Sequence, residues 1–145
     1  MDVWVAGPVR RGRAETALRA GVGLASAAAG AIHIGVVPAH LREYWLFGLF
    51  FVAAGAAQAG WAFLMAARPT RALNLAGLVG NAAVVALWIV SRTLGVPVGP
   101  EPGVAEPVGV LDALSSAFEV LIVIGTIALL RSGQRASLER AKPVS

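Results

Sequence analysis

The segment 45–64, "WLFGLFFVAAGAAQAGWAFL", decides the fold class of this chain. It contains no charged residue, and Gln58 is its only strongly polar side chain. About 20 apolar residues in an α-helix cross the hydrocarbon core of a bilayer. The segment is therefore predicted to be a transmembrane helix, whose glycines allow close helix packing and whose Trp45 and Trp61 fit the aromatic belts of the two interfaces.

Apolar character extends over the whole chain of 145 residues. Hydrophobic residues make up 57% and charged residues only 14%, whereas a soluble domain has about 25% charged residues. This composition is typical of a membrane protein. The sequence contains no cysteine, which excludes disulfides, thiolate metal ligands, iron–sulfur clusters and haem attached through thioethers.

Breaks in the apolar pattern divide the chain into four membrane spans. Pro38 is expected to end the first span, because proline cannot continue a helix. A charged turn at 67–71 separates the second from the third, and Thr70 is placed to cap the third. A Pro/Gly-rich loop at 94–110 precedes the fourth. The spans are predicted at about 17–37, 41–67, 72–92 and 110–130. The prediction is one all-α domain over residues 1–145, an integral membrane four-helix bundle.

The basic residues indicate the orientation of this bundle. Ten of the twelve lie at or before the start of the first span, in the turn after the second, or after the fourth, and only Arg42 and Arg92 lie on the other side. Because cytoplasmic loops carry an excess of Lys and Arg, both termini, including the basic tail 132–145, are predicted to be cytoplasmic. The expected location is a bacterial cytoplasmic membrane, crossed four times. The lipid bilayer, and not nucleic acid, is then the partner that explains the net charge of +4.

The N-terminal region has an alternative interpretation. The sequence "LASAAAGA" at 24–31, behind a basic N-terminus, resembles the cleavage region of a signal peptide. Cleavage would leave three spans and move the C-terminus to the outside. Arg19 interrupts the early apolar region, and the apolar stretch continues to Val37, so the uncleaved four-span arrangement is preferred.

Each span carries its polar side chains on one helical face, at 100° per residue. The four faces comprise Glu15, Arg19, Ser26 and His33; His40, Glu43 and Gln58; Asn74, Asn81, Trp88 and Arg92; and Asp112, Ser116, Glu119 and Thr126. Polar side chains in lipid normally face the bundle interior. We therefore predict a polar seam, supported by Ser26, Gln58, Asn81, Arg92 and Ser116. At 1.5 Å rise per residue, Glu119 lies roughly 14 Å below the outer end of its span, near the bilayer midplane.

The outer half of the seam holds two imidazoles and several carboxylates. His33, His40 and Glu43 are expected to share an outward-opening cavity with Asp112 and, deeper, Glu119. Imidazole with carboxylate suits Zn, Cu(II), Fe or Mn. These five residues are the predicted ligands of a divalent transition metal or of haem. The pair at 40 and 43 has the order His-x-x-Glu, the reverse of the Glu-x-x-His order of di-metal bundles.

Three other interpretations of the same residues stay open. Glu119 serves as the ionisable group of a small proton-coupled carrier or channel. The polar seam docks on a larger membrane complex, of which this chain is an accessory subunit, or on further copies of itself. The polar residues have only a structural role, in which Asn81 or Arg92 holds Glu119 and His33 bonds to a backbone carbonyl. No motif assigns a catalytic residue.

Two stretches carry a resemblance to a known group of proteins. They are "AIHIGVVPAHLREYWLFGLFFVAAGAAQAGWA" at 31–62 and "NAAVVALWIVSRTLGVPVGP" followed by "PVGVLDALSSAFEV" within 81–120. Over roughly residues 27–120 the chain resembles small four-span membrane proteins of GC-rich bacteria. The resemblance implies the four-span topology and the pairing of these two stretches, and it assigns no functional residue.

Overall fold

Four helices make up the computed structural model, which describes residues 8–140. They are α1 (Pro8–Glu43), α2 (Trp45–Ala67), α3 (Arg71–Thr93) and α4 (Val110–Arg140). All four are long and apolar enough to cross a membrane, and the described range contains no strand. The predicted all-α, membrane-spanning four-helix bundle is therefore confirmed, and the chain is a multi-pass membrane protein.

The first helix is longer than predicted. α1 continues through Pro38 to Glu43 and ends where Tyr44 takes an extended conformation, with φ −158° and ψ 126°. An interior proline removes one helical hydrogen bond, at a cost of about 3 kcal/mol, but the residues after it can still bond one turn back. His40 and Glu43 consequently belong to α1, so the predicted face that they share with Gln58 of α2 is wrong.

The turn between α2 and α3 forms as predicted. The Thr70 side chain caps α3 by accepting a hydrogen bond from the Leu73 backbone N–H at 3.1 Å. The longer loop before α4 doubles back on itself, because the Gly103 N–H donates to the Val96 carbonyl at 2.8 Å. At Gly95, where φ is +73°, a Cβ atom would lie 2.5 Å from the backbone of Gly103, so this close approach requires glycine.

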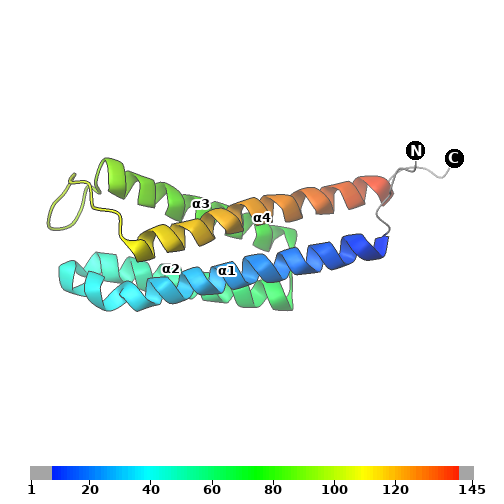
Figure 1. Ribbon diagram of the computed structural model, residues 1–145, viewed down its shortest axis with the longest axis horizontal. Coiled ribbons are helices and arrows are strands. Elements are labelled where there is room, and N and C mark those ends of the chain that lie inside the picture. Colours follow the sequence, from blue (N-terminus) through cyan, green and yellow to red (C-terminus); the bar gives the residue numbers. More distant parts are fainter. Residues whose placement is uncertain (1–7, 141–145) are drawn as a thin grey trace.

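The helices pack unevenly around their common axis. α1 packs along α2 and α4, and α4 also packs along α3, whereas α2 and α3 touch only briefly. Figure 1 shows the α1–α2 junction and the long loop 94–109 at one end of the bundle, hereafter the loop end. The α2–α3 turn at 68–70, the start of α1 and the end of α4 lie at the other, hereafter the turn end (Figure 1). This even number of crossings brings both ends of the described chain to one side.

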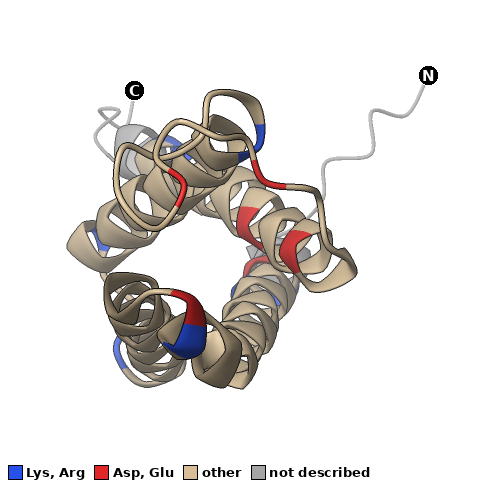
Figure 2. Ribbon diagram, turned by 90° about the vertical axis from the view of Figure 1, so that its left-hand side faces the viewer, with Lys and Arg blue, Asp and Glu red and all other residues tan. Residues whose placement is uncertain are grey.

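Charges divide between the two ends of the bundle. The turn end carries the described arginines Arg13, Arg19, Arg68, Arg71, Arg131 and Arg135, and the loop end carries Arg42 and Arg92. Viewed from the loop end, acidic segments are visible in the long loop and at the adjacent helix ends (Figure 2). The bundle thus has a basic end and a mixed, more acidic end.

The α2–α3 contact depends on one tryptophan. The Trp61 indole N–H of α2 donates to the Leu73 carbonyl of α3 at 2.8 Å. Its ring lies against Gly77, where an added Cβ would sit 2.4 Å from the indole. Trp61 also belongs to the apolar cluster that fills the turn-end half of the bundle, with Val22, Ala25, Met65, Ile122 and Leu129.

We expect Gly77→Ala to destabilise the protein by about 1–3 kcal/mol, since the hydrogen bond to Leu73 holds Trp61 in the space that the methyl group needs. Gly80→Ala on the same helix is the matched control, because nothing lies within 4 Å of its Cβ position. Thermal unfolding in detergent measures both. Equal midpoints would show that Trp61 moves aside without cost.

Candidate functional site

The centre of the bundle is a hydrogen-bonded network with one side chain from each helix. Glu119 of α4 is fully buried, and its Oε1 lies 2.9 Å from Nε2 of His33 in α1. The Gln58 amide of α2 donates to the same Oε1 at 3.2 Å and to Asn81 Oδ1 of α3 at 3.3 Å. Asn81 donates in turn to the Gly77 carbonyl at 2.8 Å. This arrangement gives partners to most of the polar atoms that lipid cannot solvate, and leaves Gln58 Oε1 and Glu119 Oε2 without one.

The predicted seam exists, but its bonding differs in detail from the expectation. Gln58 lies between Glu119 and Asn81, so the two do not bond directly, and His33 bonds to Glu119 and not to a carbonyl. Ser26 belongs to the same layer, since its hydroxyl donates to the Gln58 backbone carbonyl at 2.9 Å. All five side chains are buried. The network therefore ties the four helices together near mid-span.

A cavity of about 250 Å³ reaches this network from the loop end. His33 and Glu119 line its deep end, and most of its wall is apolar and aromatic. The wall includes Leu46, Phe47, Phe50, Phe51, Val84, Leu87 and Trp88. Phe51 packs between the two imidazoles, with ring centroids 5.4 Å from His33 and 4.2 Å from His40. The cavity is close to the lower limit of small-molecule sites, about 300 Å³.

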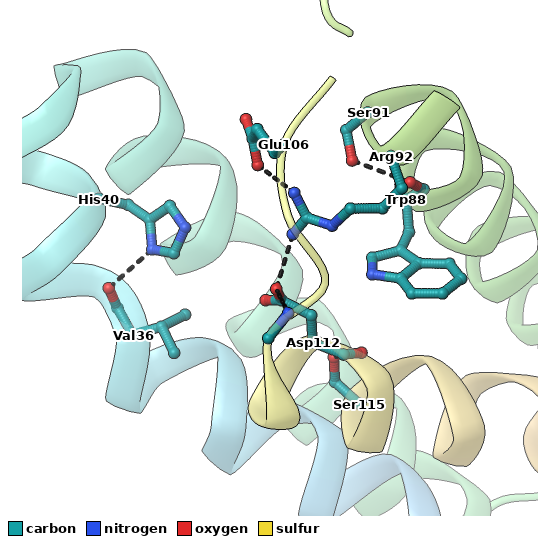
Figure 3. A network of polar contacts seen from close by, with 9 residues as sticks. Val36, His40, Trp88, Ser91, Arg92, Glu106, Asp112 and Ser115 are labelled. Atoms are coloured by element: carbon teal, nitrogen blue, oxygen red, sulfur yellow. Dashed lines mark hydrogen bonds and ion pairs between the residues drawn. The ribbon is translucent and has the colours of Figure 1, made fainter. Parts of the chain in front are cut away.

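An ion-pair cluster lies at the mouth of the cavity (Figure 3). The Arg92 guanidinium pairs with Glu106 of the loop and, at 2.7 Å, with Asp112 of α4. Asp112 Oδ2 also accepts a hydrogen bond from the Gly109 N–H at 3.1 Å, at the start of α4. Arg92 thereby fastens the loop over α3 and α4, with both of its charge partners beside the cavity.

The five predicted ligands do not form one coordination site. His33, His40, Asp112 and Glu119 line the same cavity, together with Ser116, but only His33 and Glu119 contact each other. His40 donates through Nδ1 to the Val36 carbonyl at 3.0 Å. Glu43 is exposed and does not line this cavity. Within residues 8–140 no three His, Asp or Glu side chains are grouped so that they could hold a metal ion.

Several buried polar atoms lack a partner and show where the site has bonding capacity left. Glu119 Oε2 and the Trp88 indole N–H are unpartnered, and both residues line the cavity. The Thr126 hydroxyl, about two helical turns from Glu119 on the same face of α4, is also unpartnered. Buried polar groups are normally hydrogen-bonded. The Glu119 oxygen and the Trp88 N–H are thus two points at which residues of the cavity wall have unused hydrogen-bonding capacity.

Two site residues escaped the sequence analysis. Glu106 pairs with Arg92, yet it lies in an irregular loop where no periodicity marks a residue as inward-facing. Phe51 lies between the two histidines, yet in a segment with four phenylalanines no pattern distinguishes it from lipid-facing residues. The hydrophobicity of a transmembrane helix identifies neither feature.

Fold and site together define the class: a multi-pass membrane protein with a polar network across its centre and a cavity that reaches it from one end. No family model, no curated protein and no solved structure matches this chain. The geometry around Glu119 is therefore the basis for a functional assignment.

We expect Glu119→Leu to destabilise the protein more than Glu119→Gln. Leucine removes the acceptor of both His33 and Gln58, and each interhelical hydrogen bond in a membrane contributes about 0.6–1.7 kcal/mol. Glutamine keeps the shape and one acceptor oxygen, so its effect should stay below about 1 kcal/mol. Thermal unfolding in detergent compares the two. Indistinguishable midpoints would mean that the network does not stabilise the bundle.

Proposed function

We propose that the protein is a small proton-coupled membrane carrier in which Glu119 is the ionisable group of the solute site. The observation that carries this proposal is the position of Glu119: fully buried, at the deep end of a cavity, with one carboxylate oxygen unpartnered. An ionisable residue inside a membrane span is costly, about 2.5–3.5 kcal/mol for a charged group at the helix centre, and normally marks a substrate, ion or proton pathway.

A second opening at the turn end supports a carrier over a simple binding protein. A wider cleft of about 690 Å³ lies between α1, α3 and α4 at that end, lined by Arg19, Asn74 and Leu129 among others. Leu129 is ten residues from Glu119 on α4, roughly 15 Å at 1.5 Å per residue. The two openings thus approach each other from opposite ends of the bundle.

Polar side chains mark a track between the two openings. Asn81 and Asn74 are seven residues apart on α3, and Glu119 and Thr126 are seven apart on α4, so each pair shares a helical face. The Asn74 Oδ1 and Thr126 Oγ1 atoms are buried without partners. Ile122, Trp61 and Met65 close the track in this conformation. A carrier cycle requires this apolar layer to open on one side at a time.

The His33–Glu119 contact supplies the proton chemistry of the proposed cycle. Oε1 accepts from the Gln58 amide and lies 2.9 Å from His33 Nε2, so a hydrogen bond joins the carboxyl group to the imidazole at this oxygen. Oε2 is then the oxygen that takes up a proton or accepts from a solute. A positioned carboxyl and imidazole are groups that exchange protons in buried sites.

Cysteine labelling tests alternating access, and the absence of native cysteine makes the test clean. We expect Ser116→Cys, in the cavity, to react with an impermeant maleimide from the loop side. Thr126→Cys should react from the turn side, more slowly. Ser26→Cys is the matched control, since Ser26 is equally buried and lines neither opening. If Thr126→Cys is inert from both sides, the protein is not a carrier, although the cavity can still bind a solute.

The orientation of the bundle is part of the proposal. The basic turn end supports cytoplasmic termini in a bacterial cytoplasmic membrane. On intact cells we expect an impermeant thiol reagent to label Pro102→Cys, in the exposed loop, and not Gln134→Cys, which is exposed at the turn end. The reverse pattern would invert the topology. It would also place the Glu119 cavity on the cytoplasmic side.

A metal or haem site has less support than the carrier. His33 and Glu119 provide only two contacting ligands, and Asp112 is already committed to Arg92. A cavity of about 250 Å³ also favours a small molecule over a macrocycle. Growth with Zn, Cu and Fe, followed by elemental analysis and an absorption spectrum of the purified protein, tests this alternative. We expect less than stoichiometric metal, unchanged in His33→Ala. Stoichiometric metal that is lost in His33→Ala would replace the carrier proposal.

An accessory role in a homo-oligomer or a larger membrane complex rests on the polar seam, which was expected to face a partner. The seam residues Ser26, His33, Gln58, Asn81 and Glu119 are instead buried against one another. They therefore give no support to docking through this face.

A further inference from the structure

The unpartnered oxygen of Glu119 restricts the chemistry of the solute. Oε2 is buried, bonds to no protein group and belongs to a residue that lines the cavity. A carboxylate oxygen accepts hydrogen bonds, so the solute must present a donor to it. The Trp88 indole N–H offers a second, donor contact higher on the wall (Figure 3).

The charges around the cavity favour a cationic donor. Of the residues that line it, Glu106, Asp112 and Glu119 are acidic, and Arg92 is the sole Lys or Arg. When the carboxyls are ionised and both imidazoles neutral, two negative charges remain uncompensated. An anionic solute would meet Glu119 without a free counter-charge, because Arg92 already pairs with Glu106 and Asp112. A cation would restore neutrality in a region of low dielectric, where a charge is costly without its partner.

The side chains that line the cavity indicate what the part of the solute other than its cationic group should be. Phe47, Phe50, Phe51 and Trp88 present aromatic surface, which packs against apolar groups and attracts cations through the ring faces. Few contacts join α2 and α3, and Leu87 of α3, which lines the cavity, is 39% exposed. An amphiphilic molecule concentrated at the bilayer interface has a direct route into such a site.

We propose that the loop-end cavity binds a small protonated amine with an apolar, aromatic body, whose ammonium group donates to Glu119 Oε2. The inference rests on the proposed function, because it names the solute class of the same cavity. The amine and a proton then compete for one oxygen, which couples solute binding to proton release without any further residue.

Three matched probes test the charge of the solute. Titration calorimetry with the protein in phosphatidylcholine nanodiscs at pH 7 compares 2-phenylethylamine, neutral 2-phenylethanol and anionic 3-phenylpropionate, with empty nanodiscs subtracted. We expect the amine to bind at least about tenfold more tightly than the alcohol, as one hydrogen bond between charged groups provides. No binding of the anion is expected. If the alcohol binds as tightly as the amine, the inference is wrong while the cavity still binds a solute.

Substitutions locate the contact. Glu119→Gln should weaken amine binding by about 30-fold or more and leave alcohol binding nearly unchanged, because only the amine loses a buried charge partner. Glu101→Gln is the matched control: Glu101 is exposed in the loop outside this cavity. If amine affinity survives Glu119→Gln, the assignment to Oε2 is wrong.

A chemical readout keeps the test independent of variant stability. The amine should slow alkylation of Ser116→Cys and not of Ala105→Cys, which is exposed in the loop. If Ser116→Cys reacts but the amine gives no protection, the inference about the amine is wrong, while the cavity is still shown to be open to a reagent. If Ser116→Cys is unreactive, the cavity is closed and the proposed function fails with it.

Discussion

The bundle is organised by the need to satisfy one carboxyl group in the middle of a membrane. Glu119 has no water to bond to, so its hydrogen-bond partners must come from the neighbouring helices. His33 of α1 and Gln58 of α2 provide them, and Gln58 carries the network on to Asn81 of α3. Because successive residues differ by 100° around a helix, a shift of one residue in any of these helices would turn its polar group away from the network. The network therefore determines how each helix is rotated and at what height it lies.

In a soluble protein the large apolar side chains are buried, whereas in this bundle many of them are exposed on the outer surface. The largest fully buried side chains are Ile122, Glu119, Thr126 and Ser26, three of them polar, whereas Leu24 and Phe63 are more than two-thirds exposed. Lipid solvates leucine and phenylalanine, so burying them brings the helices together only weakly. Close packing of small residues contributes instead: a Cβ at Gly30 of α1 would lie 3.1 Å from the Gly55 carbonyl of α2.

Periodicity predicted the fold and the location of the site, but not the pairing within it. The spacing of Ser26, Asn81 and Glu119 placed each on an inward face at mid-depth, because depth and angle follow from the rise and turn of a helix. The partner of each group depends on side-chain reach and on which helices are adjacent, and neither can be read from one helix at a time. The sequence therefore predicted a direct Glu119–Asn81 contact, where Gln58 intervenes.

The predicted five-residue metal site gained no support, because the boundary between the first two helices is not where the sequence indicates. Because proline cannot continue a helix, the sequence predicts that the first span ends at Pro38 and that His40 and Glu43 belong with the second span. In the structure the first helix continues through Pro38, and Glu43 does not line the cavity. One misplaced boundary thus altered the set of candidate ligands. The loop residue Glu106, which balances Arg92, had no periodic signal at all.

A carboxyl group in the middle of a membrane, with one free oxygen, can hold either a proton or a cationic hydrogen-bond donor on that oxygen, but not both. The proposed carrier function depends on this competition. The neutral, protonated state needs no counter-charge and is tolerated in the dry layer between the two openings. A cation that fills the site supplies a partner for the ionised form. His33 and Gln58 occupy Oε1 in the structure, so the proposed exchange takes place at Oε2, the atom left without a protein partner. In the proposed carrier, a single glutamate, held by neighbours that do not themselves bind the solute, links the movement of a cation to that of a proton.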